Sequence, residues 1–447
     1  MSTRLSFAAT ALAALLTTLL AGPEPALASP VKVEAELGQA SIVVTPSKRV
    51  YLRVSLEGLA LASEAKRTPV NVGLVIDRSG SMGDEDKIGK AREGAAMALE
   101  RLNEDDIASV VAFNHLVKVL VPAGHVTDHG RITRAIEAIT ADGQTALFAG
   151  TKEGIRQIEA YLDRGKVNRL ILISDGLANV GPSSPADVAE LGRQAAEKGI
   201  SITTIGVGLG YNEDLMTKLA YASDGNHAFV ERSEDLVQIF NKEFGDVLSV
   251  VAQDLIIKIE CRTGFKPMRV LGREAEIKDG VVTIHLNQLY SKQQKYAVIE
   301  LAVPAGVKAG DLTVADVEVT YAGAGTGNSR GSEKAHVTAR ITDKPSEEQA
   351  SLNKAVMGDI STQLANEVHE QAVIMRDAGK IDEAKTLLGG YAEELDKQAA
   401  SSGIAAAAPI AQQFRDDAKK LESDGEWNRT RKAMKAYEHK NKVQQAY

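Results

Sequence analysis

Apolar and polar positions follow three different periods along this chain of 447 residues. Residues 31–61 and 250–342 repeat every two residues, as in 50–54, which is typical of strands with one buried face. Residues 70–247 alternate short, almost continuous apolar runs with helical patterns. From Ser346 onward the pattern is helical to the last residue. The chain is therefore expected to combine a β region, an α/β region and an α-helical region.

The α/β region predicts a mostly parallel central sheet with helices on both faces, a Rossmann-like arrangement, because its strands are apolar throughout. Strands are expected over Val70–Ile76, Ile107–Phe113, Val117–Val121, Leu170–Ile173, Ile200–Val207 and Ala228–Val230. Helices are expected near 87–102, 130–139, 147–162, 185–198, 212–221 and 233–246. The strands at 107–113 and 117–121 are joined by a short turn and should form an antiparallel hairpin at one edge.

The β region is interrupted by the α/β region and is predicted to be a single β-sandwich. Residues 250–342 supply four or five strands, which is few for a closed sandwich, and the strands of 31–61 would complete it. We therefore expect a sandwich made of residues 29–68 and 248–343, an inserted α/β domain at 69–247, and a helical region at 344–447. Breaks between its helices are expected at Gly379, Gly389-Gly390, 401–403 and Gly425.

The N-terminus has the pattern of an export signal. Arg4 precedes an apolar run from Leu5 to Ala21, and Ala26-Leu27-Ala28 matches a small-residue cleavage site. We expect residues 1–28 to be a cleaved signal peptide and the mature protein to be secreted or periplasmic; the alternative is a retained anchor. No later stretch approaches the ~20 apolar residues that a membrane span needs, so the mature chain is expected to have no transmembrane segment.

Composition and charge exclude several classes of function. The net charge of -8 argues against a general nucleic-acid-binding protein. Cys261 is the single cysteine, which excludes an intramolecular disulfide and a cysteine zinc site. Segment 429–442 is locally basic, and we expect either a solvated helix face or a weak contact with an anionic membrane or partner. No base is placed beside a nucleophile, so we expect no catalytic residues and no enzyme.

Oxygen-bearing side chains gather at the ends of the predicted parallel strands. Asp77, Ser79 and Ser81 alternate directly after the strand that ends at Ile76, so an extended turn can point all three the same way. Thr145 lies in a glycine-marked loop before a predicted helix, and Asp175 ends another apolar strand. Such oxygen ligands suit a hard cation such as Mg²⁺, Ca²⁺ or Mn²⁺. Open α/β sheets bind ligands at this edge.

This constellation resembles the metal-ion-dependent adhesion site of von Willebrand factor A-type domains, whose motif is Asp-x-Ser-x-Ser with a threonine and an aspartate from two later loops. The matching residues here are Asp77, Ser79, Ser81, Thr145 and Asp175, so the motif is complete. The resemblance covers residues 69–247, and the flanking β segments loosely resemble secreted proteins of the inter-alpha-trypsin-inhibitor heavy-chain type. It implies a divalent cation, Mg²⁺ first, with an open position for an Asp or Glu carboxylate of a protein partner.

Two functions from different classes are therefore expected. The first is an exported, metal-dependent protein-binding module of the adhesion type. The second is a structural scaffold of an envelope complex, in which the ion only braces the loops.

The stretch that begins at Asp77 does not match an EF-hand loop, because Met82 and Ile88 stand where an EF-hand requires glycine and glutamate. The acidic residues 84–86 are interpreted as the start of a helix, where they complement its dipole, rather than as further ligands.

Overall fold

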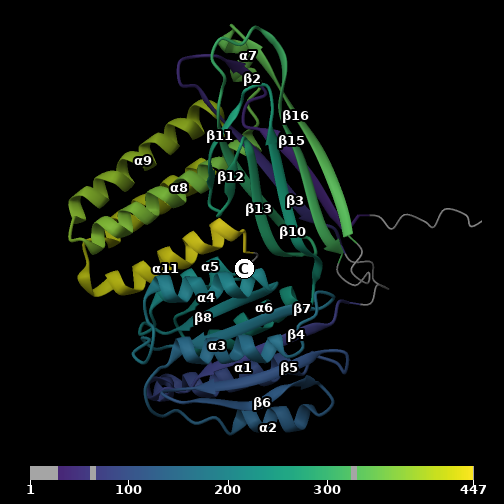
Figure 1. Ribbon diagram of the computed structural model, residues 1–447. Coiled ribbons are helices and arrows are strands. Elements are labelled where there is room, and N and C mark those ends of the chain that lie inside the picture. The colour runs from purple at the N-terminus through teal and green to yellow at the C-terminus, as the bar shows by residue number, and fades with distance from the viewer. Residues whose placement is uncertain (1–28, 61–66, 324–329, 446–447) are drawn as a thin grey trace, which may run out of the picture.

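The computed structural model describes residues 29–60, 67–323 and 330–445. Figure 1 shows an α/β domain at the bottom, a long β-sandwich above it and helices beside the sandwich. The predicted signal peptide, residues 1–28, lies outside the described residues. The predicted fold class, an α/β domain inserted in a β-sandwich and followed by a helical region, is confirmed.

The α/β domain is built on a six-stranded sheet in the order β6-β5-β4-β7-β8-β9. Every neighbouring pair is parallel except β5 and β6, which form the predicted antiparallel edge hairpin. The strands are β4 (Val70–Asp77), β5 (Ile107–Phe113), β6 (Val117–His125), β7 (Val167–Ser174), β8 (Ile200–Val207) and β9 (His227–Val230). Because β4 and β7 are central neighbours, the loops that follow them meet at one point of the sheet edge.

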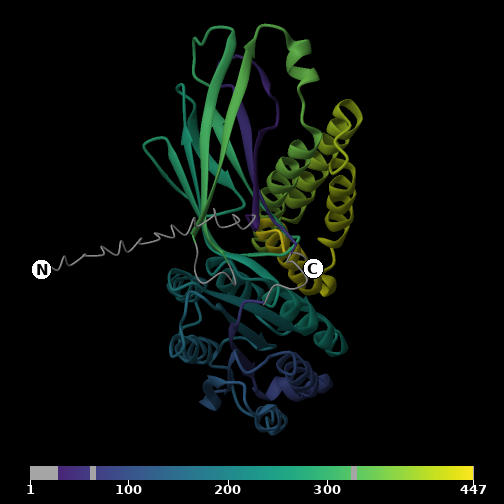
Figure 2. The same ribbon diagram turned by 90° about the vertical axis from the view of Figure 1, so that its right-hand side faces the viewer.

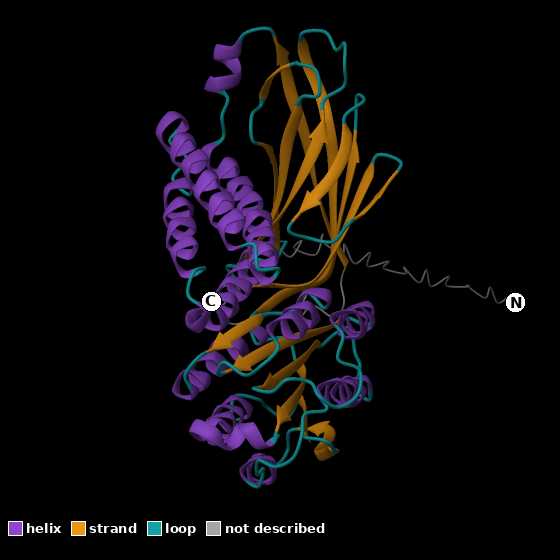
Figure 3. Cartoon of the chain, turned by 90° about the vertical axis from the view of Figure 1, so that its left-hand side faces the viewer, coloured by secondary structure: helices purple, strands orange, loops and turns teal. Residues whose placement is uncertain are grey.

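Helices cover both faces of this sheet, as Figure 3 shows. Val72, Leu74 and Ile76 of β4 face one core with α1 (Lys87–Leu99), α2 (His129–Glu137) and α6 (Leu236–Val247). Val75 faces the other core with α3 (Leu147–Glu159), α4 (Pro185–Glu197) and α5 (Glu213–Ala222). Two short 3-10 helices, η1 (Gly80–Asp86) and η2 (Ser233–Asp235), precede α1 and α6. Burial on both faces explains why the strands are apolar throughout.

The sandwich combines strands from both sides of the insertion. One sheet has the order β1-β3-β14-β11 and the other β12-β13-β10-β15-β16-β2. The strands before the insertion are β1 (Val31–Leu37), β2 (Ser41–Val43) and β3 (Arg49–Gly58). Those after it are β10 (Val250–Cys261), β11 (Lys266–Leu271), β12 (Glu276–Lys278), β13 (Val281–Tyr290), β14 (Gln294–Ala302), β15 (Gly310–Gly323) and β16 (Arg330–Thr342). One apolar core lies between the two sheets and contains residues from before and after the insertion, so neither segment can bury its apolar face without the other.

The helical region packs along one side of the sandwich (Figure 2). Its helices are α7 (Pro345–Ala350), α8 (Lys354–Asp377), α9 (Ile381–Ser402), α10 (Ala407–Lys420) and α11 (Asp424–Val443). Val356 and Ile360 of α8 pack on Leu271, Tyr296 and Val298 of the four-stranded sheet. Of the helices in the described residues, none combines the length and the apolar character needed to cross a membrane.

Two expected helix breaks are wrong. α9 continues through Gly389-Gly390, because Ala384, Leu388, Ala392 and Leu395 bury one stripe of the helix in the bundle core. This packing outweighs the roughly 1 kcal/mol by which each glycine disfavours a helix. Gly425 lies inside the first turn of α11, whose cap is the preceding Ser423.

The basic segment 429–442 is a docked helix rather than a free solvated face. In Figure 1, α11 lies between the other C-terminal helices and α5 of the α/β domain. Lys432 is buried. Other cations of α11 also form ion pairs: Arg429 with Glu231, Arg431 with Glu213, Asp214 and Asp377, and Lys442 with Glu370. These cations are neutralised within the chain, so the structure does not support the expected contact with a membrane or an external partner.

Candidate metal centre

The residues of the predicted site meet at the carboxyl ends of β4 and β7. Asp77 is the last residue of β4, and its Oδ1 accepts a hydrogen bond from the Ser79 N–H at 2.7 Å. Ser79 Oγ lies 3.2 Å from Ser81 Oγ. Ser81 Oγ donates to Asp175 Oδ1 at 2.7 Å. A chain of short polar contacts therefore connects the loop after β4 with the loop after β7.

Thr145 reaches the same place from a third loop, which precedes α3. A Cβ added at Gly176 would lie 2.7 Å from Thr145 Oγ1 and 3.4 Å from Asp77 Oδ2, so the hydroxyl and the carboxylate face the same glycine. The Thr145 N–H donates to Asn179 Oδ1 at 2.9 Å, and the Thr145 carbonyl accepts from the N–H groups of Asn179 and Val180. The structure thus brings the hydroxyl of the third loop to the two carboxylate loops.

Asp77 carries a buried charge that a cation would balance. Its side chain is inaccessible to solvent, and its oxygens accept hydrogen bonds from neutral donors, the Ser79 N–H and the Ser174 hydroxyl. Burial raises the pKa of Asp77 to about 6; the hydrogen bonds offset part of this effect, and the nearby Asp175 adds like charge. The residues present therefore fit a divalent cation with oxygen ligands.

Three further residues shape this centre, and the sequence analysis missed them. Ser174 donates to Asp77 Oδ2, Asn179 holds the backbone of the Thr145 loop, and Lys87 places its ammonium 2.8 Å from Asp175 Oδ2. Ser174 is a polar residue at the end of an apolar strand, which was a usable signal. Lys87 gave no comparable signal, because its partner Asp175 lies 88 positions away in the chain.

The acidic stretch 84–86 lies outside this centre. Its residues are exposed and belong to η1, and Glu85 and Asp86 have left-handed backbone conformations with φ of 51° and 52°. They lie directly before α1, with Asp86 as its N-cap residue, which agrees with the expected place at a helix N-terminus. In the described parts of the chain, no group of three or more His, Cys, Asp or Glu side chains could hold a metal ion. The hydroxyl-rich centre around Asp77 and Asp175 is therefore the candidate.

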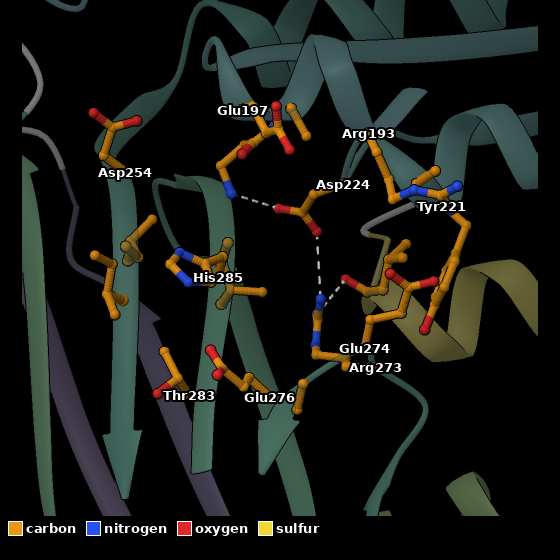
Figure 4. A pocket seen from close by; sticks show the side chains of 18 of the residues that line it. Arg193, Glu197, Tyr221, Asp224, Asp254, Arg273, Glu274, Glu276, Thr283 and His285 are labelled. Atoms are coloured by element: carbon orange, nitrogen blue, oxygen red, sulfur yellow. Dashed lines mark hydrogen bonds and ion pairs between the residues drawn. The ribbon is translucent and has the colours of Figure 1, made fainter. Parts of the chain in front are cut away.

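A cavity of about 720 Å³ lies elsewhere, between the α/β domain and the sandwich. Figure 4 shows Asp224, which follows α5, facing Arg273 of the sandwich across this cavity. Asp224 pairs with Lys295 at 3.0 Å and with Arg273 at 3.3 Å. Burial opposes ionisation of Asp224, but these two cations hold its pKa below the ordinary value. The cavity thus belongs to an ion-paired joint between domains, away from the candidate metal centre.

The sequence model of the von Willebrand factor type A domain matches residues 71–242. These residues form a von Willebrand factor type A (VWA) domain. The matched residues run from β4 into α6, so they contain the whole sheet and the loops of the candidate metal centre. The family resemblance inferred from the sequence is therefore confirmed.

Curated relatives share this domain at modest identity. The uncharacterized protein YfbK of Escherichia coli is 27% identical over 215 residues, which are 48% of this chain and 37% of YfbK. Protein sll0103 of Synechocystis is 25% identical over 286 residues, 62% of this chain and 67% of that protein. Inter-alpha-trypsin inhibitor heavy chain H2 of Mus musculus is 28% identical over 188 residues, 40% of this chain and 20% of the heavy chain. This chain thus covers little more than a third of YfbK.

The likeness of fold extends beyond the VWA domain. The solved structure of a von Willebrand factor type A protein from Catenulispora acidiphila has a TM-score of 0.69 and 16% identity to this chain. The match covers 88% of this chain and 90% of that protein. Because so much of the chain is covered, the match includes the sandwich and the helices that flank the VWA domain.

Proposed function

We propose that this protein is an exported, metal-dependent protein-binding module of the adhesion type. The ion is a divalent cation, Mg²⁺ first, with Mn²⁺ or Ca²⁺ as alternatives, and its ligands are Asp77, Ser79, Ser81, Thr145 and Asp175. When bound, the ion supplies a coordination position for an Asp or Glu carboxylate of a partner, because only two of its own ligands are charged. The observation that carries the proposal is the meeting of these side chains, from three loops, at one edge of the VWA sheet.

Exposed leucines on the surrounding loops support a protein as the partner. Leu116 lies in the turn between β5 and β6, Leu177 lies in the loop after β7, and Leu209 lies in the loop after β8. They are 61%, 59% and 41% exposed. These loops leave the same sheet edge as the metal centre. A protein ligand at the ion would cover this apolar surface, and removing apolar surface from water is favourable by about 25 cal/mol per Å².

A scaffold with a bracing ion is the second candidate. It is favoured by direct hydrogen bonds between the loops of the centre. The Gly80 N–H donates to the Gly143 carbonyl at 2.9 Å, and the Asp142 N–H donates to the Arg78 carbonyl at 2.8 Å. Loops connected in this way hold their shape without a partner, and an ion would only tighten them.

Co-purification from an envelope extract separates the two functions. The full chain is offered as bait in Mg²⁺ and in EDTA, together with Asp77→Ala and the control Lys90→Met, which changes a lysine paired with Glu93 on α1. A binding module captures partners in Mg²⁺, loses them in EDTA and in Asp77→Ala, and keeps them in Lys90→Met. Partners that remain bound in EDTA favour the scaffold.

Export is part of this proposal and rests on the signal-peptide pattern of residues 1–28. A bacterial host should release a protein that begins at Ser29, which mass spectrometry of the mature N-terminus measures. An uncut N-terminus on exported material would support the retained anchor instead. Nucleic acid is not proposed as a partner, because the net charge is -8.

A further inference from the structure

Lys87 contacts one of the two carboxylate oxygens that Asp175 would offer to the ion. Its ammonium lies 2.8 Å from Asp175 Oδ2 and 3.5 Å from the Ser81 carbonyl oxygen. The Ser81 hydroxyl donates to the other carboxylate oxygen at 2.7 Å. The Asp175 side chain is inaccessible to solvent and the Lys87 side chain is 12% exposed. Water therefore screens this ion pair only weakly.

The backbone on both sides of Lys87 accommodates its side chain. Lys87 is the first residue of α1, and it directly follows Glu85 and Asp86, whose φ angles are positive. On the opposite side, Gly208 follows β8 with a φ of 69°, and a Cβ there would lie 3.3 Å from Lys87 Cε and 3.5 Å from Nζ. Gly208 thus leaves the space through which the lysine reaches Asp175.

We infer that Lys87 is an internal counter-cation of Asp175 that competes with the divalent ion and sets the affinity of the VWA domain for it. The inference rests on the proposed function, because it assumes that Asp175 is a ligand. An ion that uses Asp175 must displace the ammonium or accept a positive charge beside it, and both weaken binding. The centre would then fill only at high concentrations of the divalent ion.

The two carboxylates of the centre are not equivalent in this respect. Asp77 accepts hydrogen bonds from neutral donors, whereas Asp175 has a cationic partner within the chain. A change that removes the charge of Lys87 frees Asp175 for the ion. The same change leaves a buried carboxylate uncompensated when no ion is present, which destabilises the fold. Metal affinity and metal-free stability should therefore move in opposite directions.

Calorimetric titration of the full chain with Mg²⁺ and Mn²⁺ tests the inference. Lys87→Met keeps an unbranched side chain, one atom shorter, without its charge. Lys90→Met is the matched control on the same helix, where Lys90 pairs with Glu93 at 2.8 Å. Lys87→Met should bind Mg²⁺ at least tenfold more tightly than the wild type, and Lys90→Met should bind it equally. In EDTA Lys87→Met should melt below the wild type, and saturating Mg²⁺ should narrow this difference.

Equal or weaker Mg²⁺ binding by folded Lys87→Met would overturn the inference while leaving the proposed function intact. If the wild type and both variants bind neither ion, the proposed function fails together with it. If Lys87→Met does not fold, Lys87→Gln replaces it, because glutamine removes the charge and keeps a hydrogen-bond donor. Lys87→Arg keeps the charge and should retain the weak binding of the wild type; tightened binding in this variant would also overturn the inference.

Discussion

Lys432 of α11 and Glu213 at the start of α5 form a buried ion pair, although they lie 219 positions apart in the chain. Lys432 Nζ lies 2.5 Å from Glu213 Oε2, and the two side chains are 3% and 7% exposed. Lys432 also donates to the Tyr211 carbonyl at 2.8 Å. Tyr211 follows Gly210, whose Cβ position would lie 2.9 Å from the Asp175 carbonyl oxygen. The last helix is thus fastened to a loop that adjoins the candidate metal centre.

The two partners of this ion pair should contribute unequally to stability. Glu213→Gln leaves the buried ammonium of Lys432 without its carboxylate, and breaking a buried pair in this way costs about 3–5 kcal/mol. Lys432→Met leaves Glu213 in contact with Arg431, so its cost should be nearer the ordinary loss of about 1 kcal/mol. Urea unfolding of both variants measures the free energies. An equal or larger loss in Lys432→Met would contradict this assignment.

His439, on the same helix, should make stability depend on pH. Burial lowers the pKa of His439 to about 4, and its Nε2 lies 2.9 Å from the Gly225 carbonyl oxygen. Because the unfolded histidine titrates near 6.5, the unfolded state binds more protons between these values, and stability falls as pH decreases from about 6.5 to about 4. The full loss is about 3 kcal/mol.

Chemical denaturation of the wild type and His439→Gln across this pH range measures that contribution. The glutamine cannot titrate, so the variant should show a shallower decline of the unfolding free energy with falling pH. The same slope in both proteins would assign the effect to other groups.

Asp77→Ala should abolish stabilisation by metal. A ligand that binds only the folded state adds RT ln(1 + [L]/Kd), about 2.7 kcal/mol at a hundredfold excess over Kd. The wild type should therefore melt higher in Mg²⁺ or Mn²⁺ than in EDTA, and Asp77→Ala should not. Differential scanning calorimetry gives the melting temperatures. A metal response of the same size in the variant would remove Asp77 from the ligand set.

Thr145→Ala should separate metal binding from partner binding. The change keeps both carboxylates, so most of the stabilisation by metal should remain. It removes a hydroxyl that faces Gly176, and it loosens the loop that shapes the position for a partner. Partner capture should fall at least tenfold, about 1.4 kcal/mol. Calorimetry with the metal and surface plasmon resonance with the co-purified partner measure the two effects; capture at wild-type strength favours the scaffold.

The excised segment 69–247 should fold, because helices close both faces of its sheet. It should melt roughly 5–10 °C below the full chain, since it lacks covering residues from β13. Tyr290 packs in the core of the VWA domain, and the buried Arg169 donates to Gln288 at 2.7 Å. Circular dichroism during heating measures both claims. An unfolded segment would refute the inserted-domain boundaries, and an unchanged melting temperature would refute the role of β13.

Local sequence patterns determined the architecture of the VWA domain. Continuous apolar runs such as Val70–Ile76 require burial on both faces, and this requirement alone predicts a covered parallel sheet. The metal-ligand hypothesis came from the order and spacing of residues such as Asp77 and Thr145, since parallel strands end at a common edge.

Only the tertiary structure decided which distant charges pair with each other and whether weak helix formers stay helical. Gly389-Gly390 stays helical because neighbouring residues of α9 are buried in the bundle. Lys432 appeared to be a solvated lysine, and Lys87 an ordinary helix residue, until the fold placed Glu213 and Asp175 beside them. Periodicity reports which face of an element is buried. The partner of a charge depends on contacts across the whole chain, which no local pattern encodes.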